Sequence, residues 1–379
     1  METLIALLSD LVRIESINPD LTSTGSGEAA VAAYVADWLR RAGIDTVVED
    51  VRDGRPNVVA RVPGSGGGRT LMLNGHLDTV GITGMTDPLT PRIADGRMYG
   101  RGTYDMKAGV AACMLALVAA KQRQTPLRGD VIFTAVMDEE VAGQGTRAIA
   151  ARYKADGALI AEPTELELVV AHRGFVWHEI ETHGVAAHGS MPELGVDAIA
   201  RMGRVLVALE DLGREMATRP AHPLLKTGSL HAGLIRGGQE PSSYPASCVL
   251  SLERRTLPGE TAESVDAEYR AILERLASAD PTFSATMTNT LAYGPMETDP
   301  QGPLAQTVRA AASMVLGHEP ITAGAPYWTD GATLGEVGIP AVLFGPSGTG
   351  AHAFEEWVDL ASVKQCVEIY TRVIESFCA

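Results

Sequence analysis

The sequence predicts an α/β domain, with a mostly parallel mixed sheet flanked by helices, that is interrupted by an inserted α+β domain. Two observations lead to this fold class. Short apolar runs alternate with helical patterns up to residue 173 and again after residue 291, which is typical of a sheet with helices on its faces. The strands predicted between these stretches alternate polar and apolar residues, as strands covered on one side do. We therefore expect one domain from 1–173 with 291–379, and an insert at 174–290.

The first part of the chain contains helical and strand patterns in turn. Between Glu28 and Leu39 apolar residues recur at helical spacing, and Gly43 ends the helix. The apolar run 108–120, about 13 residues, is too short to span a bilayer and indicates a buried helix. Short apolar runs predict strands at 57–62, 69–73, 130–137 and 157–160.

A glycine-rich segment, GSGGG at 64–68, separates the first two of these strands. Glycine-rich loops that bind phosphate carry a Lys-Ser/Thr pair, which is missing here. We therefore interpret the segment as a hairpin turn that joins two neighbouring strands.

The insert combines strands that have one polar face with two long helices. The expected strands are 175–181, 248–255 and 283–289, and the expected helices are 196–212 and 262–277. After Pro303 a helix extends to Leu316, and the apolar run 341–344 again has the pattern of a buried strand. The first domain is therefore completed after the insert.

The composition is that of an ordinary globular protein, with 45% hydrophobic and 21% charged residues. A net charge of −16 argues against a nucleic-acid partner, which requires basic surfaces. The N-terminus lacks the basic start and apolar core of a signal peptide. The four cysteines form no CxxC pair, which fits unpaired thiols in a reducing compartment. We expect a cytoplasmic protein without a membrane or nucleic-acid partner.

The stretch LMLNGHLDTV at 71–80 restricts the possible functions of the chain more than any other segment. A buried strand ends here, and His76 and Asp78 follow with one residue between them. Alternate side chains of an extended segment point to the same face, so these two project together. A carboxylate beside a metal-binding imidazole either binds the metal too or holds the other ring nitrogen. Alone, the pair is as readily explained by an ordinary loop histidine.

Four further segments place polar residues just past strands or in glycine-rich turns. Singly, each has a simpler explanation, because an aspartate before a helix is usually an N-cap and adjacent acids are usually solvated. Together they converge on the carboxyl edge of the predicted sheet, where α/β proteins bind ligands. These residues are Asp105 in GRGTYDMKAG, Glu139 and Glu140 in MDEEVAG, Glu162 in AEPT and His352 in GTGAHAFEE.

Two histidines and several carboxylates suit a pair of metal ions such as zinc. Two close ions share a bridging carboxylate and a bridging water, whose pKa they lower. One carboxylate must stay off the metals to accept the proton of that water, and the adjacent Glu139 and Glu140 allow one base and one ligand. No GxSxG elbow and no GxGxxG loop between strand and helix supports another chemistry.

With these residues in view, the chain resembles the dinuclear-zinc amidohydrolases of the M20 peptidase family. The ordered motifs HLD, GRGTYDMK, DEE, EPT, AHGS, RTLPGE and GAHxxxE carry the resemblance over nearly the whole chain. It implies that Asp105 bridges two zinc ions, that Asp78 orients His76, and that Glu139 is the general base. It also implies a cis peptide after Asp105. The implied ligands are His76, Asp105 and Glu162 for one ion and Asp105, Glu140 and His352 for the other.

The resemblance further implies that the insert is a lid that pairs two subunits into a homodimer. His188, in GVAAHGSMP, matches a histidine that reaches the partner's active site and polarises the scissile carbonyl. Arg255, in LERRTLPGE, matches an arginine that holds a substrate carboxylate, and a guanidinium suits such bidentate binding. Without the resemblance, both would be read as loop and surface residues.

The expected function is metal-dependent hydrolysis of the amide bond of an N-acyl-amino acid or dipeptide-like substrate, of the acetylornithine deacetylase type. The expected cofactors are two Zn²⁺, with Co²⁺ or Mn²⁺ as substitutes. The alternatives are a broad aminoacylase, a succinyl-diaminopimelate desuccinylase or a glutamate-type carboxypeptidase. Ala332 stands where desuccinylase-like members carry an arginine, which weighs against that alternative. A catalytically inactive binding relative is the alternative from another class, and the intact ligand set with Glu139 argues against it.

Overall fold

The computed structural model describes residues 1–379, and its contacts divide the chain into two compact units. The first unit is Met1–Val170, Glu297–Ala323 and Thr329–Ala379. The second is Ala171–Met296 with Gly324–Trp328. The insert predicted at 174–290 lies within this second unit, which extends a few residues beyond it at each end.

The short segment Gly324–Trp328 belongs to the second unit, although the sequence places it in the first domain. The backbone N–H of Arg173 donates to the carbonyl oxygen of Ala325, and the ring of Trp328 lies 4.8 Å from that of Tyr293. These contacts join parts of the chain that are distant in sequence, so no local sequence pattern predicts them.

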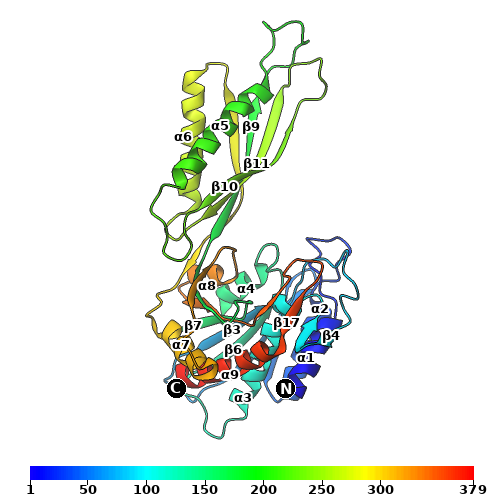
Figure 1. Cartoon of the computed structure of the whole chain (residues 1–379), viewed down its shortest axis with the longest axis vertical. Coiled ribbons are helices and arrows are strands. Elements are labelled where there is room, and N and C mark those ends of the chain that lie inside the picture. Colours follow the sequence, from blue (N-terminus) through cyan, green and yellow to red (C-terminus); the bar gives the residue numbers. More distant parts are fainter. The chain divides into compact units, whose positions relative to one another are not determined.

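The first unit is built on a nine-stranded sheet with helices on both faces (Figure 1). Its central strands β6, β3, β7 and β15 are parallel, and the pairs β1–β2, β2–β6 and β15–β8 are antiparallel. The predicted mixed α/β fold is thus confirmed, with parallel pairing along the four central strands. The strand order is β1 (Asp45–Arg52), β2 (Arg55–Val62), β6 (Val131–Val136), β3 (Leu71–His76), β7 (Gly157–Ile160), β15 (Ala341–Leu343), β8 (Leu168–His172) and β13 (Met296–Glu297), and β14 (Thr322–Ala325) pairs with β8.

Two groups of helices cover this sheet (Figure 1). The first group packs around α9, and the second includes α4 and α8, which contact each other. Strands β3 and β6 are buried along their whole length, as parallel strands between two helical layers are. The helices are α1 (Glu2–Arg13), α3 (Ala108–Lys121), α7 (Pro303–Leu316) and α9 (Leu360–Phe377) in one group, and α2 (Ala29–Arg41), α4 (Gln144–Arg152) and α8 (Gly331–Glu336) elsewhere on the sheet.

The glycine-rich segment 64–68 is not a hairpin turn, so that prediction is wrong. Strand β6 lies between β2 and β3, which therefore do not pair. The segment instead crosses the start of β6: the N–H of Ser65 donates to Leu127 and that of Gly66 to Arg128. A Cβ on Gly64 would lie 2.4 Å from the carbonyl oxygens of Arg128 and Gly129, so this crossing requires glycine.

A small four-stranded sheet is formed by two segments far apart in the sequence, one before Asp105 and one on both sides of His352. Its order is β16 (Gly348–Thr349), β17 (Trp357–Asp359), β5 (Arg97–Tyr99) and β4 (Arg92–Ala94). The one-turn helix η1 (Thr103–Lys107) connects β5 to α3. By length and composition alone, Thr103–Lys121 could cross a membrane, but 72% of it is buried inside the protein, which makes it a core helix.

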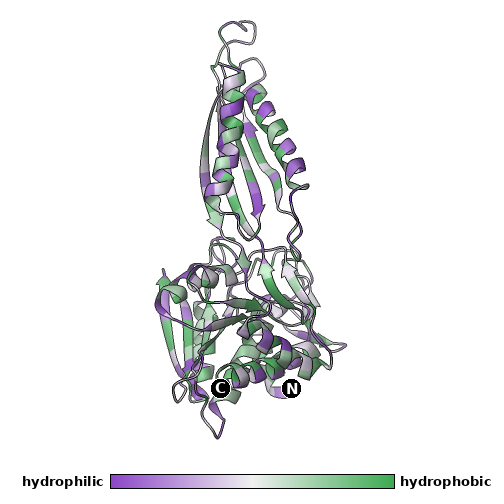
Figure 2. Cartoon of the chain, turned by 90° about the vertical axis from the view of Figure 1, so that its left-hand side faces the viewer, coloured by the Kyte–Doolittle hydropathy of each residue, from purple (hydrophilic) through white to green (hydrophobic).

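The second unit is an antiparallel sheet with helices α5 (Ala198–Met216) and α6 (Ala262–Ala279) on one face (Figure 2). Residues of β11 alternate between buried and half-buried, because only one face of the strand is covered. This α+β arrangement confirms the predicted class. The strand order is β10 (Ser229–Gly237), β11 (Ser247–Thr256), β9 (Gly174–His183) and β12 (Ser284–Tyr293). The sequence analysis missed β10, an exposed edge strand that contains glycines.

Candidate metal centre

The first candidate ligand set consists of His76, Asp105 and Glu162. His76 ends β3, and its Nε2 lies 3.1 Å from Asp105 Oδ1 and 3.7 Å from Glu162 Oε1. Glu162 follows β7, the strand that pairs with β3. One ligand atom of each residue lies within 4.8 Å of the others, and His76 and Glu162 are buried. The spacing suits one metal ion between a nitrogen and two oxygens.

The second candidate set consists of Asp105, Glu140 and His352. The Nε2 atom of His352 lies 2.9 Å from Glu140 Oε2 and 3.5 Å from Asp105 Oδ2. These ligand atoms also lie within 4.8 Å of one another. Asp105 is common to both sets and turns Oδ1 to one and Oδ2 to the other, which is the arrangement of a bridging carboxylate. The donor chemistry therefore fits two borderline divalent cations.

The acidic and histidine side chains of this cluster shift one another's pKa values. Hydrogen bonds with Asp105 and Glu140 raise the pKa of His352 to about 10. Burial lowers the pKa of His76, but the negative charge of Glu162 and the bond to Asp105 outweigh it, and the result is well above the ordinary value. Burial raises the pKa of Glu162 to about 8. Carboxyl groups with a raised pKa beside rings with a raised pKa form a site whose protons a divalent cation could replace.

Local backbone features bring Asp105 to His76. The Asp105–Met106 peptide is cis, as the family resemblance implies. Gly75 lies against Met106, and a Cβ at this position would come within 2.9 Å of the Met106 methyl carbon. Gly75 thus lets η1 approach the end of β3 closely enough for the Asp105 carboxylate to reach the His76 ring.

Asp78 lies behind His76 and contacts more than the imidazole. The Nδ1 atom of His76 is 2.9 Å from the backbone oxygen of Asp78 and 3.5 Å from its Oδ1. The Asp78 carboxylate also accepts the backbone N–H groups of Glu139, at 3.2 Å, and Glu140, at 3.1 Å. It therefore connects His76 to the backbone of both glutamates that follow β6.

The two adjacent glutamates have different surroundings. Glu140 contacts His352, whereas Glu139 belongs to neither ligand set. Desolvation and the negative charge of Glu162 raise the pKa of Glu139 well above its ordinary value. A carboxyl group of this kind, next to two ligand sets but outside them, suits proton transfer.

A buried polar network that sequence reasoning missed lies behind Asp78. Asn18 Nδ2 donates to Asp78 Oδ2 at 2.8 Å and to Asp138 Oδ1 at 3.1 Å. Arg55 forms a bidentate salt bridge with Glu28, with Nε–Oε2 and Nη2–Oε1 distances of 2.8 and 2.5 Å. Its Nη2 also lies 3.4 Å from Asp138 Oδ1. Arg55 and Asp138 were a weak sequence signal for this network, because each is a charged residue at the end of a buried strand. Nothing in the sequence singles out Asn18.

His188 and Arg255, the other two predicted residues, lie in the second unit. His188 is exposed, and the backbone N–H of Ser190 donates to its Nδ1 at 3.2 Å. The neutral ring therefore carries its proton on Nε2, which makes Nε2 a donor. Arg255 is about a third exposed, and its Nε donates to Glu253 at 2.7 Å.

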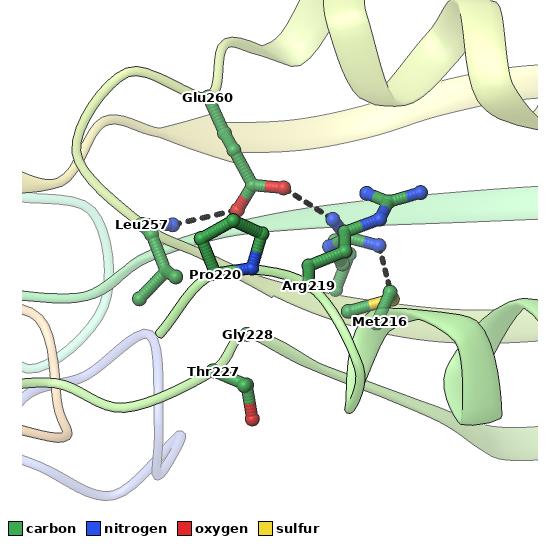
Figure 3. Close-up of a pocket in the computed structure, with 8 residues that line it drawn as sticks. Met216, Arg219, Pro220, Thr227, Gly228, Leu257 and Glu260 are labelled. Carbon is green, nitrogen blue, oxygen red and sulfur yellow. Dashed lines mark hydrogen bonds and ion pairs between the residues drawn. The ribbon is translucent and has the colours of Figure 1, made fainter. Parts of the chain in front are cut away.

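The neighbouring Arg254 points to the opposite face of β11 and is buried. It pairs with Glu260 beside a cavity of about 20 Å³ lined also by Met216 and Arg219 (Figure 3). A space of this size holds about one water molecule, so it is no substrate site.

Comparison with known proteins places this centre in a family. Residues 72–376 match the model of peptidase family M20/M25/M40. The acetylornithine deacetylase of Myxococcus xanthus is 31% identical over 100% of this chain and 98% of its own length. An N-formyl-4-amino-5-aminomethyl-2-methylpyrimidine deformylase of Halalkalibacterium halodurans is 28% identical over 99% of this chain and 93% of its own.

Solved structures agree in fold. Aminopeptidase PepT of Bacillus cereus superposes with a TM-score of 0.82 at 21% identity, covering 100% of this chain and 99% of its own. The Bacillus subtilis YXEP protein, described as a dinuclear metal binding peptidase from the M20 family, gives 0.76 at 18% identity, with coverage of 99% and 98%. The resemblance found in the sequence is thereby confirmed: the chain belongs to peptidase family M20/M25/M40 and is an amidohydrolase or peptidase of that family.

Proposed function

We propose that this enzyme hydrolyses the amide bond of N-acyl-amino acids, as an acetylornithine deacetylase does. One observation carries the proposal: two ligand sets share Asp105, and Glu139, which belongs to neither, interacts electrostatically with Glu162 and His76. His76, Asp105 and Glu162 hold one ion, and Asp105, Glu140 and His352 hold the other, with Zn²⁺ as the proposed ion. Two such ions, when bound, lower the pKa of a water molecule and polarise a carbonyl group.

Glu139 is the proposed general base. Its carboxylate takes a proton from the attacking water and afterwards gives it to the nitrogen of the leaving amine. A raised pKa makes its carboxylate a stronger base and favours the carboxylic acid that holds the proton between the two steps. Asp78 fixes the backbone N–H of Glu139 and so sets the direction of this side chain.

His188 and Arg255 bind the substrate in this proposal. The Nε2–H of His188 donates to the carbonyl oxygen, on which negative charge develops during attack. Arg255 binds the carboxylate of the amino acid. Its Nε donates a hydrogen bond to Glu253, and its two terminal nitrogens remain for a bidentate contact with the substrate. We further propose that His188 acts on the site of a partner subunit in a homodimer, and that the protein works in the cytoplasm.

The relatives support a short acyl group. The two named above remove acetyl and formyl groups, and both match this chain along its whole length. Ala332, buried in α8, offers no charge for the free carboxylate of a succinyl group. Removal of formyl from an aminomethylpyrimidine is the second candidate function, since that relative is as extensively similar. Arg255 favours the amino acid, because the pyrimidine has no carboxylate for it.

A turnover screen with the zinc- or cobalt-loaded protein tests the proposal. The substrates are N-acetyl-, N-formyl- and N-succinyl-amino acids, dipeptides and the N-formyl aminomethylpyrimidine. We expect the highest kcat/KM for an N-acetyl-amino acid such as N-acetylornithine. In Arg255→Met we expect a reduced value for every substrate that carries the amino-acid carboxylate, but not for the pyrimidine. A preference for the pyrimidine establishes the second candidate. No hydrolysis of any amide by protein that holds two ions rejects the proposal.

A further inference from the structure

Glu356, a residue outside both ligand sets, has a buried carboxylate with four hydrogen bonds. Its Oε2 accepts from Arg101 Nη1 at 2.7 Å and from the backbone N–H of Gly102 at 2.9 Å. Its Oε1 accepts the backbone N–H of Tyr104 at 2.8 Å and of Asp105 at 3.0 Å. The side chain is fully buried, and these donors satisfy both oxygens. One carboxylate therefore fixes the backbone that carries the bridging Asp105.

Arg101 extends this arrangement to two other segments. Its Nε and Nη2 donate to the carbonyl oxygen of Gly81, at 3.2 and 3.1 Å, in the loop that follows Asp78. Its Nη2 also donates to the carbonyl oxygen of Ala353, beside His352, at 2.9 Å. The guanidinium is buried and matches these acceptors with its fixed fork of donors. The Arg101–Glu356 pair thus contacts the three chain segments that carry His76, Asp105 and His352.

The two ligand sets depend on this pair unequally. His76 and Glu162 follow β3 and β7, which pair with each other in the core of the large sheet. His352 lies in an exposed turn with a positive φ of 61°, and Arg101, just before η1, holds its neighbour Ala353 by one hydrogen bond. Loss of the pair therefore frees His352 from Asp105 and leaves His76 and Glu162 in place.

We infer that Arg101 and Glu356 are positioning residues that hold His352 and Asp105 at the distance required for the second metal ion. This inference rests on the proposed metal-dependent function. When a partner in this pair changes, buried backbone N–H groups lose their acceptor, and the Asp105 backbone and the His352 turn move independently. The ion at Asp105, Glu140 and His352 is then bound more weakly, whereas the ion at His76, Asp105 and Glu162 is retained.

Zinc titration against a competing chelator tests the inference in Glu356→Gln and Arg101→Lys. Partners that orient metal ligands contribute on the order of 10- to 100-fold to metal affinity. We expect one of the two binding constants to fall by about this factor in Glu356→Gln, and the other to stay near the wild-type value. With Co²⁺, the absorption bands of the weaker site should shift. Arg101→Lys, which keeps the charge but loses the bonds to Gly81 and Ala353, should show a loss of similar size at the same site.

A matched control is Glu260→Gln in the second unit, which removes the partner of the buried Arg254. It should lower the melting temperature and leave both zinc affinities and the cobalt spectrum unchanged. If Glu356→Gln loses zinc affinity equally at both sites, or at neither site, the inference is overturned. If Glu356→Gln does not fold, Arg101→Lys decides by the same criterion. A wild-type protein that binds fewer than two ions overturns this inference and the proposed function together, whereas two ions without amide hydrolysis overturn the proposed function alone.

Discussion

At the scale of single residues, the proposed mechanism gives different tasks to the adjacent Glu139 and Glu140. Glu139→Gln should retain both metal ions and lose activity by about 10²- to 10⁴-fold, because an amide cannot accept the proton of water. Glu140→Gln should weaken the ion beside His352, because Glu140 contacts that ring. Metal analysis and steady-state kinetics on both variants check this. Full turnover in Glu139→Gln, or loss of metal from it, would contradict the assigned roles.

The protonated histidines give metal binding a defined pH dependence. Zinc ligands must be deprotonated, whereas the metal-free site holds His76 and His352 as cations, with the pKa of His352 at about 10. At pH 7 zinc binding should therefore release about two protons or more, and affinity should rise with pH toward 10. Calorimetry in buffers of different ionisation enthalpy measures the release. An affinity that does not change between pH 7 and 9 would show that these rings are already neutral.

The clustering of the proposed ligand residues was predictable, because each follows a buried strand or lies in a glycine-rich turn, whereas their roles rest on the family motifs. His76 and Glu162 illustrate this, since both lie at the carboxyl ends of paired strands. Asn18 was not predictable: its partners Asp78 and Asp138 lie 60 and 120 residues away, and an asparagine near the N-terminus has no local pattern.

At the scale of elements, β2 carries two arginines that offer a direct test of burial. Arg55 is nearly buried and faces Glu28 and Asp138, whereas Arg61 is exposed and pairs with Asp130. Arg55→Met leaves two buried carboxylates without their cation and should lower the free energy of unfolding by about 3–5 kcal/mol. Arg61→Met, the control on the same strand, should cost at most about 1 kcal/mol. Denaturant unfolding of both variants provides the comparison.

The decrease in the free energy of unfolding caused by Arg55→Met should itself depend on pH. Burial raises the pKa of Glu28 and of Asp138 in the folded protein. An acid with a raised folded pKa destabilises the fold above that pKa and has no effect below its unfolded value, about 4. The difference between Arg55→Met and wild type should therefore shrink as the pH falls toward 4. A constant difference from pH 7 to 4 would indicate that lost packing, rather than charge, causes the destabilisation.

Local sequence patterns identified most helices and central strands, and they failed where pairing is non-local. The GSGGG segment suited a hairpin turn by composition, yet its neighbours β2 and β3 lie on either side of β6. Strand β10 gave no signal, because an exposed edge strand with several glycines lacks the alternation that burial imposes.

At the scale of the whole molecule, the proposed homodimer predicts complementation between inactive variants. Strand β10 is an edge of its sheet, exposes Leu234 and Ile235, and offers unpaired backbone groups to a second copy. His188→Ala and Glu139→Gln should each lose turnover. Mixed subunits should regain activity, because one site then receives Glu139 from one chain and His188 from the other.

The control for complementation is a mixture of Glu139→Gln with Arg55→Met/Glu139→Gln, which contains no intact Glu139 and should stay inactive. Subunit exchange is followed with tagged chains, and recovery is limited by the heterodimer fraction. If exchange occurs and no activity returns, His188 acts within its own chain or has no catalytic role.

The strand order β7–β15–β8 also has a consequence for synthesis of the protein on the ribosome. Strands β7 and β8 are consecutive in sequence, yet β15, at Ala341–Leu343, lies between them. The chain must therefore emerge almost to its end before the large sheet is continuous. His76, Asp105 and Glu162 have all emerged by then, but His352 comes only after β15. A nascent chain thus acquires the residues of one ion early and completes the pair of sites only as translation finishes.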